Sequence, residues 1–390
     1  MPLFTDFEPA DPQTAAAMLA IAAADGISLV PQGNRTKLRA TTNTNGAAPI
    51  SSSRLTTGLA HYAGDLVATA PAGATLHSVN AALALERQWI PLDPPHADRA
   101  TIGGIVACND SGPRRHRFGA PRDLIIGIEV AMTNGRVAQS GGRVVKNVAG
   151  YDLARLLCGS RGALGLITAV TFKLAPIASV SRTSVAHFSS VEQAIAAALS
   201  LAASPALTPS ALDIGAPDPR LLVRFETTAR SAEHMAASAR ATLAATAERI
   251  DDYEGDAEAA LWSAHAQGES AGGGLVASMS VLPTRVAAAV MHVERLAQEH
   301  GVTWALTGRA ALGALRVTGD GSPSAQVAFA AALREATAAL EGSLQVRGID
   351  AVGEARTARL GPIGSAAAIG FSVKRRFDPS GVLPYPWERA

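Results

Sequence analysis

Residues 89–118 read WIPLDPPHADRATIGGIVACNDSGPRRHRF, and this stretch decides the fold. It joins a proline run to the pair Gly103-Gly104, the apolar run IVAC (105–108) and the polar loop NDSG (109–112). Glycine allows a backbone to approach a ligand closely, at an entropic cost that needs a reason. Backbone amides and small hydroxyls in such loops converge on anionic or planar ligands. The stretch therefore predicts a cofactor loop.

Composition bounds the class of protein. A chain of 390 residues with 48% hydrophobic residues is long enough for two domains with sizeable cores. Its net charge of +1 gives no electrostatic signature of nucleic-acid binding. The two cysteines, Cys108 and Cys158, form neither a disulfide framework nor a metal-ligand spacing, so we expect a reducing compartment and no metal site.

The pattern at the N-terminus predicts a cytoplasmic location. MPLFTDFEPADPQ lacks a basic stretch followed by an apolar core. No run approaches the roughly 20 apolar residues of a membrane span, so direct insertion is not expected. Peripheral attachment at the inner membrane through a complex is the remaining route to a membrane.

Strand-and-turn patterns occur twice in the first half. A strand at 27–30 runs into PQGNRTK (31–37), whose amides, hydroxyl and cations suit a pyrophosphate. A second strand at 66–70 leads through a turn to a helix over 75–86, with Thr75 as its cap. Asn134-Gly135 is a strong hairpin signal.

The second half alternates helices and strands in an α+β pattern typical of a cap domain. Strands are expected at 180–188, 221–227 and 274–282, and helices at 191–203, 231–250, 284–300 and 324–341. A nicotinamide site is not expected, because Gly159, Gly162 and Gly165 lack the dinucleotide-binding spacing and precede a strand.

Two long motifs resemble a known family. PPHADRATIGGIVACNDSGPRR (94–115) and RVVKNVAGYDLARLLCGSRGALGLIT (143–168) are similar to the flavin-binding domain of the vanillyl-alcohol oxidase (PCMH-type) family. Within it they resemble the FAD-binding E subunits of bacterial glycolate oxidases. The resemblance covers roughly residues 1–176 and implies a PCMH-type FAD-binding domain of two α/β subdomains. An α+β cap domain over 177–370 and a tail over 371–390 that returns to the FAD domain are then expected.

The resemblance also implies which residues bind FAD. Gly165 and Ile167 correspond to backbone contacts with the isoalloxazine and ribityl part, and such contacts tune the flavin electronically. Asp152 has a second interpretation as the cap of a helix over 153–157. The expected cofactor-binding residues are Pro31, Gln32, Gly33, Asn34, Arg35, Thr36, Pro71, Gly73, Pro94, Thr101, Ile102, Gly103, Gly104, Ala107, Ser111, Gly112, Asp152, Gly162, Gly165 and Ile167.

Candidate catalytic residues are few. Arg114 and Arg115 suit a substrate carboxylate or the acidic face of a partner subunit, because a guanidinium matches carboxylate geometry. A solvated loop or an ion-pair network is their alternative. His96 is a candidate proton acceptor near the flavin, or else a loop histidine. Some relatives tether the flavin through cysteine or histidine, but Cys108 fits a small core residue, so we expect non-covalent FAD.

The chain departs from the family in two places. The histidine-rich motif GHxGDGNxH of catalytic hydroxy-acid dehydrogenases is absent between residues 176 and 370. The family tail FDPxGxxNPG reads FDPSGVLPYP here, which puts Leu383 or Pro384 where an asparagine would reach the flavin. These departures put independent substrate oxidation in doubt.

Three functions stay open. The first is an FAD-binding subunit of a glycolate oxidase-like complex. In that complex, the resemblance implies, a D subunit oxidises a small 2-hydroxy acid on its own flavin and an iron-sulfur F subunit passes the electrons on. The second is a self-sufficient FAD-dependent oxidase of a small hydroxy acid or alcohol. The third is a scaffold subunit without FAD, against which the intact glycine loops argue.

Overall fold

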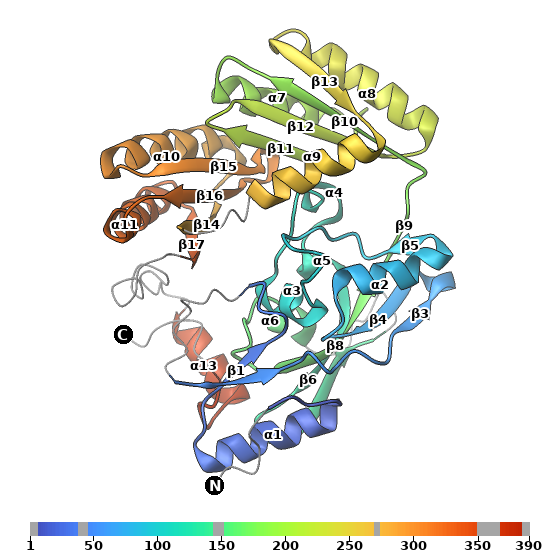
Figure 1. Ribbon diagram of the computed structural model, residues 1–390, viewed down its shortest axis with the longest axis vertical. Coiled ribbons are helices and arrows are strands. Elements are labelled where there is room, and N and C mark those ends of the chain that lie inside the picture. The colour runs from blue at the N-terminus through green and yellow to red at the C-terminus, as the bar shows by residue number, and fades with distance from the viewer. Residues whose placement is uncertain (1–6, 38–45, 143–151, 269–273, 349–366, 384–390) are drawn as a thin grey trace. The chain divides into compact units, whose positions relative to one another are not determined.

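The computed structural model describes residues 7–37, 46–142, 152–268, 274–348 and 367–383. The chain divides into two compact units, each with its own cores (Figure 1). The first unit comprises Met1–Ser111, Gly119–Ile177 and Pro362–Ala390, and the second comprises Gly112–Phe118 and Ala178–Gly361. The expected boundaries differ in that they assigned residues 112–118 to the FAD domain. They also assigned the start of helix α13 (Ala367–Phe377) to the cap.

A five-stranded antiparallel sheet forms the centre of the first unit. Its order is β3 (Ala60–Tyr62), β4 (Val67–Pro71), β8 (Leu166–Lys173), β6 (Ile125–Ala131) and β7 (Val137–Gly141). The hairpin predicted at Asn134-Gly135 is confirmed, because it joins β6 to β7 and Gly135 has a φ of 81°. A short pair, β5 (Gln88–Trp89) and β9 (Ala175–Pro176), lies outside this sheet.

Short capped helices share a core with the sheet. Thr75 caps α2 (Leu76–Leu83), Thr101 caps α3 (Ile102–Cys108) and Asp152 caps α6 (Leu153–Leu157). A polar side chain at this position satisfies an amide that the first turn leaves unpaired. Apolar residues of all three helices belong to the same buried core as Val170 and Phe172 of β8. The helix α5 (Pro121–Leu124) leads directly into β6.

A second, smaller core makes a separate subdomain of the first unit. Strands β1 (Leu29–Gln32) and β2 (Ala48–Ser51) pair in parallel. The alanine- and leucine-rich face of helix α1 (Pro12–Asp25) shares a core with Leu29 and Ile50 of these strands and with Ala131 of β6, and α1 contacts β6 and β7. Asp11 caps α1 and Gly26 ends it in the left-handed region, as the sequence indicates. The expectation of a PCMH-type domain built from two α/β subdomains is confirmed.

An eight-stranded antiparallel sheet forms the second unit. Its order is β13 (Arg249–Tyr253), β10 (Val180–His187), β12 (Arg220–Thr227), β11 (Ala211–Ala216), β15 (Thr303–Arg309), β16 (Ala314–Asp320), β14 (Leu275–Ser280) and β17 (Ser343–Gly348). The expected helix over 231–250 ends earlier. Residues 249–253 instead form the edge strand β13, which pairs with β10.

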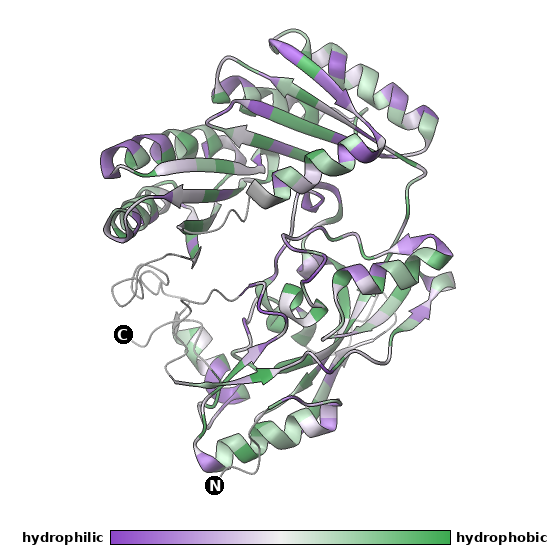
Figure 2. Ribbon diagram, in the orientation of Figure 1, coloured by the Kyte–Doolittle hydropathy of each residue, from purple (hydrophilic) through white to green (hydrophobic). Residues whose placement is uncertain are grey.

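The two faces of this sheet differ in chemistry. Four helices share the larger core with one face: α7 (Val191–Ala203), α8 (Ala229–Leu243), α10 (Val286–His300) and α11 (Pro323–Ala339). Along β12, Leu221, Val223 and Phe225 face this core, whereas the alternate residues Arg224 and Glu226 are charged. Figure 2 shows that the strands of this sheet carry both hydrophobic and hydrophilic segments. Helix α9 (Gly255–Gly268) packs on the charged face through Trp262.

A buried charge cluster lies on the face that α9 covers. The Asp213 side chain is 0% exposed, and its carboxylate receives hydrogen bonds from His265 Nε2 at 3.1 Å and Arg309 Nε at 3.2 Å. Burial alone raises the pKa of Asp213, but Arg309 and His265 outweigh it and hold the pKa below its ordinary value. The carboxylate is therefore charged at neutral pH and balances Arg309 inside the unit.

Asp213→Ala is expected to lower the free energy of unfolding of the second unit by about 3–5 kcal/mol, because it leaves the Arg309 guanidinium buried without its carboxylate. Denaturant unfolding followed by tryptophan fluorescence measures the change. The matched control is Asp218→Ala, which removes a carboxylate that is 67% exposed and paired with Arg220 at 3.5 Å. The control is expected to change the free energy by less than about 1 kcal/mol. Equal effects of the two variants contradict this account.

Candidate cofactor site

Several loops of the first unit meet at helix α3. Thr101 precedes the helix, and its hydroxyl accepts a hydrogen bond from the Gly104 amide at 3.2 Å. The turn after β4 is attached by the Gly103 amide, which donates to the Ala72 carbonyl at 2.8 Å. The loop after α6 is attached by the Arg161 amide, which donates at 2.8 Å to a carbonyl in the last turn of α3. Helix α3 thus fixes the relative positions of these loops.

The loop that follows β1 is tied to the same place. Asn34 Nδ2 donates to the Arg99 carbonyl at 2.9 Å, and Lys37 Nζ donates to the Pro95 carbonyl at 2.8 Å. Lys37 also forms a 2.6 Å ion pair with Asp110, whose side chain is only 2% exposed. Sequence reasoning did not select Lys37 or Asp110 as site residues. Both lie within the predicted ligand loops, Lys37 as one of the cations of 31–37 and Asp110 in the polar loop 109–112.

The amides of two predicted ligand loops differ in whether they are already paired. At the start of α3, the amides of residues 102–104 donate to Ala74, Ala72 and Thr101 respectively. In the loop after β1, the part of the chain that the structure describes supplies no acceptor for the amides of residues 33–36. Unpaired amides in a turn form an anion-binding concavity. Residues 33–36, rather than the start of α3, therefore fit a pyrophosphate.

The glycines of the site serve two purposes. A Cβ atom on Gly33 would lie 2.2 Å from Thr101 Oγ1, and one on Gly103 would lie 3.0 Å from the Ala72 Cβ. These two glycines let protein segments pack together. Among the described residues, a Cβ on Gly104 would meet only Thr101 Oγ1, at 3.0 Å, with open space otherwise. Gly104 therefore offers bare backbone to whatever occupies that space.

Left-handed backbone is concentrated in the same loops. Of the seven non-glycine residues with positive φ that the structure describes, four are Arg35, His96, Asn109 and Arg161. Each lies at the end of α3 or in a loop attached to it. Such conformations are unfavourable for residues with a Cβ atom and gather at functional sites. This strain marks the α3 region as a site independently of its sequence motif.

The structure brings most of the predicted cofactor residues together, and some lie elsewhere. Pro31 and Gln32 end β1, Pro71 ends β4, and Gly162 packs on Pro31. Ile167 is buried in the sheet core of the first unit. Asp152 is exposed and caps α6 with an ion pair to Arg155 at 3.2 Å, whereas Gly112 belongs to the second unit. The remaining members around α3 are Gly33, Asn34, Arg35, Thr36, Gly73, Pro94, Thr101, Ile102, Gly103, Gly104 and Ala107, with Ser111 just beyond it and Gly165 at the start of β8.

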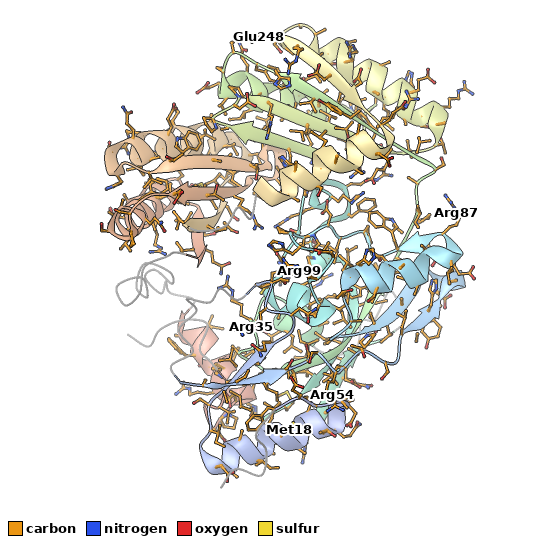
Figure 3. The ribbon with its side chains drawn as sticks, viewed as in Figure 1. Met18, Arg35, Arg54, Arg87, Arg99 and Glu248 are labelled. Carbon is orange, nitrogen blue, oxygen red and sulfur yellow. The ribbon has the colours of Figure 1, made fainter. Side chains whose placement is uncertain are left out.

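His96 lies in the loop before α3 in a cationic setting. Burial, then the charges of Lys37 and Arg99, lower the pKa of His96 below its ordinary value of 6.5. The imidazole is therefore neutral at pH 7 and is able to accept a proton. Arg35 and Arg99 are exposed on loops that flank the same region (Figure 3).

Arg114 forms a structural ion pair inside the second unit. Its guanidinium donates to both carboxylate oxygens of Glu226, with the shortest distance 2.6 Å. Burial raises the pKa of Glu226, but Arg114 and Arg224 outweigh burial and set it at about 2. Arg115 is half-buried in the short helix α4 (Arg115–Phe118). The ion-pair interpretation of the arginine cluster therefore holds for Arg114.

Comparison with known proteins identifies the region around α3. A family profile described as "FAD binding domain" matches residues 6–141. These residues are an FAD-binding domain of the PCMH type. FAD is the cofactor of this domain, and the unpaired amides of residues 33–36 and the open space at Gly104 fit it. FAD supplies an acceptor and donor of electrons when it is bound.

Similarity to curated proteins is confined to part of the chain. The chain is 45% identical over 113 residues to "Glycolate oxidase subunit GlcE" of Escherichia coli (strain K12), which is 29% of this chain and 32% of that protein. It is 33% identical over 178 residues to "Glycolate oxidase subunit GlcD" of Bacillus subtilis (strain 168), which is 45% of this chain and 38% of that protein. The matches thus span about a third of the length of these relatives.

A solved structure shares the fold more widely. It is described as "alkyldihydroxyacetonephosphate synthase in P212121" and superposes with a TM-score of 0.71 at 14% identity, covering 96% of this chain and 75% of that one. This likeness concerns the fold alone, and because it covers 96% of this chain it includes the second unit. Among the described residues, no helix is long and apolar enough to span a membrane. Within the same residues, no group of three or more His, Cys, Asp and Glu side chains is arranged to hold a metal ion.

Gly104→Val is expected to weaken FAD binding at least about tenfold, because the side chain enters the space that the domain leaves open for its ligand. The thermal stability of the FAD-free protein is expected to change little. Gly103→Ala is the matched comparison, since its methyl group meets Ala72 and overpacks the protein itself by about 1–3 kcal/mol. FAD titration and melting curves of both variants test the difference. Unchanged FAD affinity in Gly104→Val contradicts this placement of the cofactor.

Glu226→Gln is expected to reduce the acid sensitivity of the second unit. The folded-state pKa of about 2 lies below the ordinary 4.5, so the ionised carboxylate stabilises the fold above pH 4.5 and this contribution is lost as the pH falls toward 2. Its size is about 3 kcal/mol. The measurement is the slope of the unfolding free energy against pH between pH 6 and pH 2. Glu248→Gln, which changes an exposed carboxylate, is the control (Figure 3). An unaltered slope in Glu226→Gln would count against the ion pair.

Proposed function

We propose that this chain is the FAD-binding subunit of a complex that oxidises a 2-hydroxy acid, with glycolate to glyoxylate as the reaction. The 45% identity to the glycolate oxidase subunit GlcE, in a region that contains an FAD-binding domain, carries this proposal. A D-lactate dehydrogenase of Archaeoglobus fulgidus, 32% identical over 179 residues, supports the wider class of 2-hydroxy acid substrates. The activity is an FAD-dependent oxidation of a CH–OH donor.

FAD is bound without a covalent link. The amides of residues 33–36 bind its pyrophosphate, and Gly104 and the neighbouring loops adjoin the rest of the cofactor. Cys108 lies within α3, and burial raises the pKa of the other thiol, Cys158, to about 12, so Cys158 is not a reactive thiolate. Cys108 is half-buried within its helix.

The partners are a D-type subunit with its own flavin and an F-type iron-sulfur subunit. Arg114 is committed to Glu226 and so does not serve as the anchor of a substrate carboxylate. The tail carries Leu383, with a buried side chain, where the family pattern has an asparagine in one register. The flavin of this chain then acts as a relay or as part of the architecture of the complex. It attaches to a membrane only through these partners.

A self-sufficient oxidase of a small hydroxy acid or alcohol is the second candidate function. Its one supporting observation is His96, which is neutral at pH 7 and lies in a loop attached to α3. A neutral imidazole at the flavin meets the first requirement of a general base.

The purified chain is expected to be yellow, to release intact FAD on acid denaturation and to reduce its flavin very slowly with glycolate. Anaerobic stopped-flow absorbance measures the rate, first with the lone chain and then with the two partner subunits added. Fast reduction in the lone chain, lost in His96→Ala, establishes the self-sufficient oxidase instead. A colourless protein that takes up no FAD on reconstitution overturns both candidates. A flavin that stays in the acid precipitate contradicts the non-covalent link.

A further inference from the structure

Helix α13, near the C-terminus of the described chain, carries a fully buried lysine. The Lys374 side chain is 0% exposed, and its ammonium group donates to the carbonyls of Ala163 at 2.9 Å and Leu383 at 3.0 Å. It also pairs with the Asp378 carboxylate one turn further along the chain. An ammonium group has three donors, so these three acceptors match its full capacity.

Asp378 completes the arrangement on the side of the tail. Its carboxylate accepts hydrogen bonds from the amides of Val382 at 3.1 Å and Leu383 at 2.8 Å. Val382 and Leu383 are themselves buried, and the Val382 carbonyl accepts from the Leu29 amide at the start of β1. Lys374, Asp378 and the backbone of 382–383 therefore form one unit of structure, here called the tail clasp.

The tail clasp holds a loop of the cofactor site through Ala163. The neighbouring Gly162 has a φ of 79°, and a Cβ atom there would lie 2.9 Å from the ring of Pro31. Pro31 precedes the amides of residues 33–36. On the other side, Gly165 packs so closely on β6 that a Cβ atom would lie 2.5 Å from Val130. Displacing Ala163 therefore displaces the surface on which Pro31 rests.

The charge pair makes the tail clasp sensitive to single substitutions. Burial lowers the pKa of Lys374, and the Asp378 carboxylate opposes this shift by favouring the charged form. Removal of one charge leaves the other buried and uncompensated, whereas removal of both does not. An experiment can therefore separate two effects of losing Lys374: the loss of stability caused by a lone buried charge, and the loss of the contact that positions Ala163.

We propose that Lys374 is a positioning residue for FAD: it fixes the loop 160–165 against Pro31, so that FAD binding and ordering of residues 374–383 are coupled. The proposal rests on FAD binding by this chain, which the proposed function shares. Coupling is reciprocal, so bound FAD stabilises the tail clasp as much as the clasp strengthens FAD binding. The tail thus serves the cofactor site even though it lacks the asparagine of the family pattern.

The test compares Lys374→Met with the double variant Lys374→Met/Asp378→Asn in the full-length chain. The single variant is expected to lose both thermal stability and FAD affinity. The double variant is expected to regain most of the stability, because no lone buried charge remains, while its FAD dissociation constant stays about tenfold or more above that of the wild type. Ser190→Ala, which removes the cap of α7 in the second unit, is the control for a purely structural loss.

A second measurement follows the reverse direction of the coupling. Adding FAD to the FAD-free wild type is expected to slow hydrogen exchange at the amides of Val382 and Leu383, and to leave it unchanged in the double variant. Recovery of both stability and FAD affinity in the double variant overturns the proposal. The proposal is also overturned if FAD leaves the hydrogen-exchange rates of the Val382 and Leu383 amides in the wild type unchanged. Failure of the wild type to bind FAD is a different outcome, because it refutes the proposed function itself.

Discussion

The Thr101 side chain is the contact on which the cofactor site depends. Its hydroxyl caps α3 through the Gly104 amide, and it occupies the space that a Cβ atom on Gly33 would need. The backbone of Thr101 bridges to Thr75, the cap of α2. A single 2% exposed threonine thus meets the loop after β1, the turn after β4 and two helix starts. Buried and close-packed groups of this kind keep loops rigid when the loops themselves carry few apolar residues.

The local sequence was sufficient to predict the FAD domain but not the role of each glycine. The motif between residues 94 and 115 indicated the family, and Thr75 and Asn134-Gly135 indicated a helix start and a hairpin that the structure confirms. From the sequence, the glycines were interpreted as positions where the backbone approaches the ligand closely. At Gly33 and Gly103 the close neighbour is instead protein, which only the three-dimensional contacts reveal. The assignment of the individual cofactor-binding residues stays a prediction.

The second unit shows why the α+β pattern of the sequence alone did not predict all the strands of its sheet. Strands β11 and β15 carry Asp213 and Arg309 at buried positions, so neither reads as a simple alternation of apolar and polar residues. The charges are tolerated because they pair with each other across neighbouring strands beneath α9. The first two residues of β13 were predicted as the end of an alanine-rich helix over 231–250, since helix propensity is local whereas pairing with β10 is not. Long-range pairing is the information that the local pattern lacks.

Buried cations in both units are used to hold chain segments rather than ligands. Arg114 lies in a motif that suggests ligand binding, and Lys374 lies in the helix before the tail motif. Each is neutralised by a carboxylate within its own unit. Such pairs contribute little net stability relative to apolar residues, yet removing one partner is costly, so they specify a single arrangement of the segments that they join. Arg114 joins its segment to Glu226, 112 positions away in the sequence, and Lys374 joins the tail to Ala163, 211 positions away. The cations near α3 that stay exposed, Arg35 and Arg99, are therefore the ones whose charge is available to an anionic cofactor.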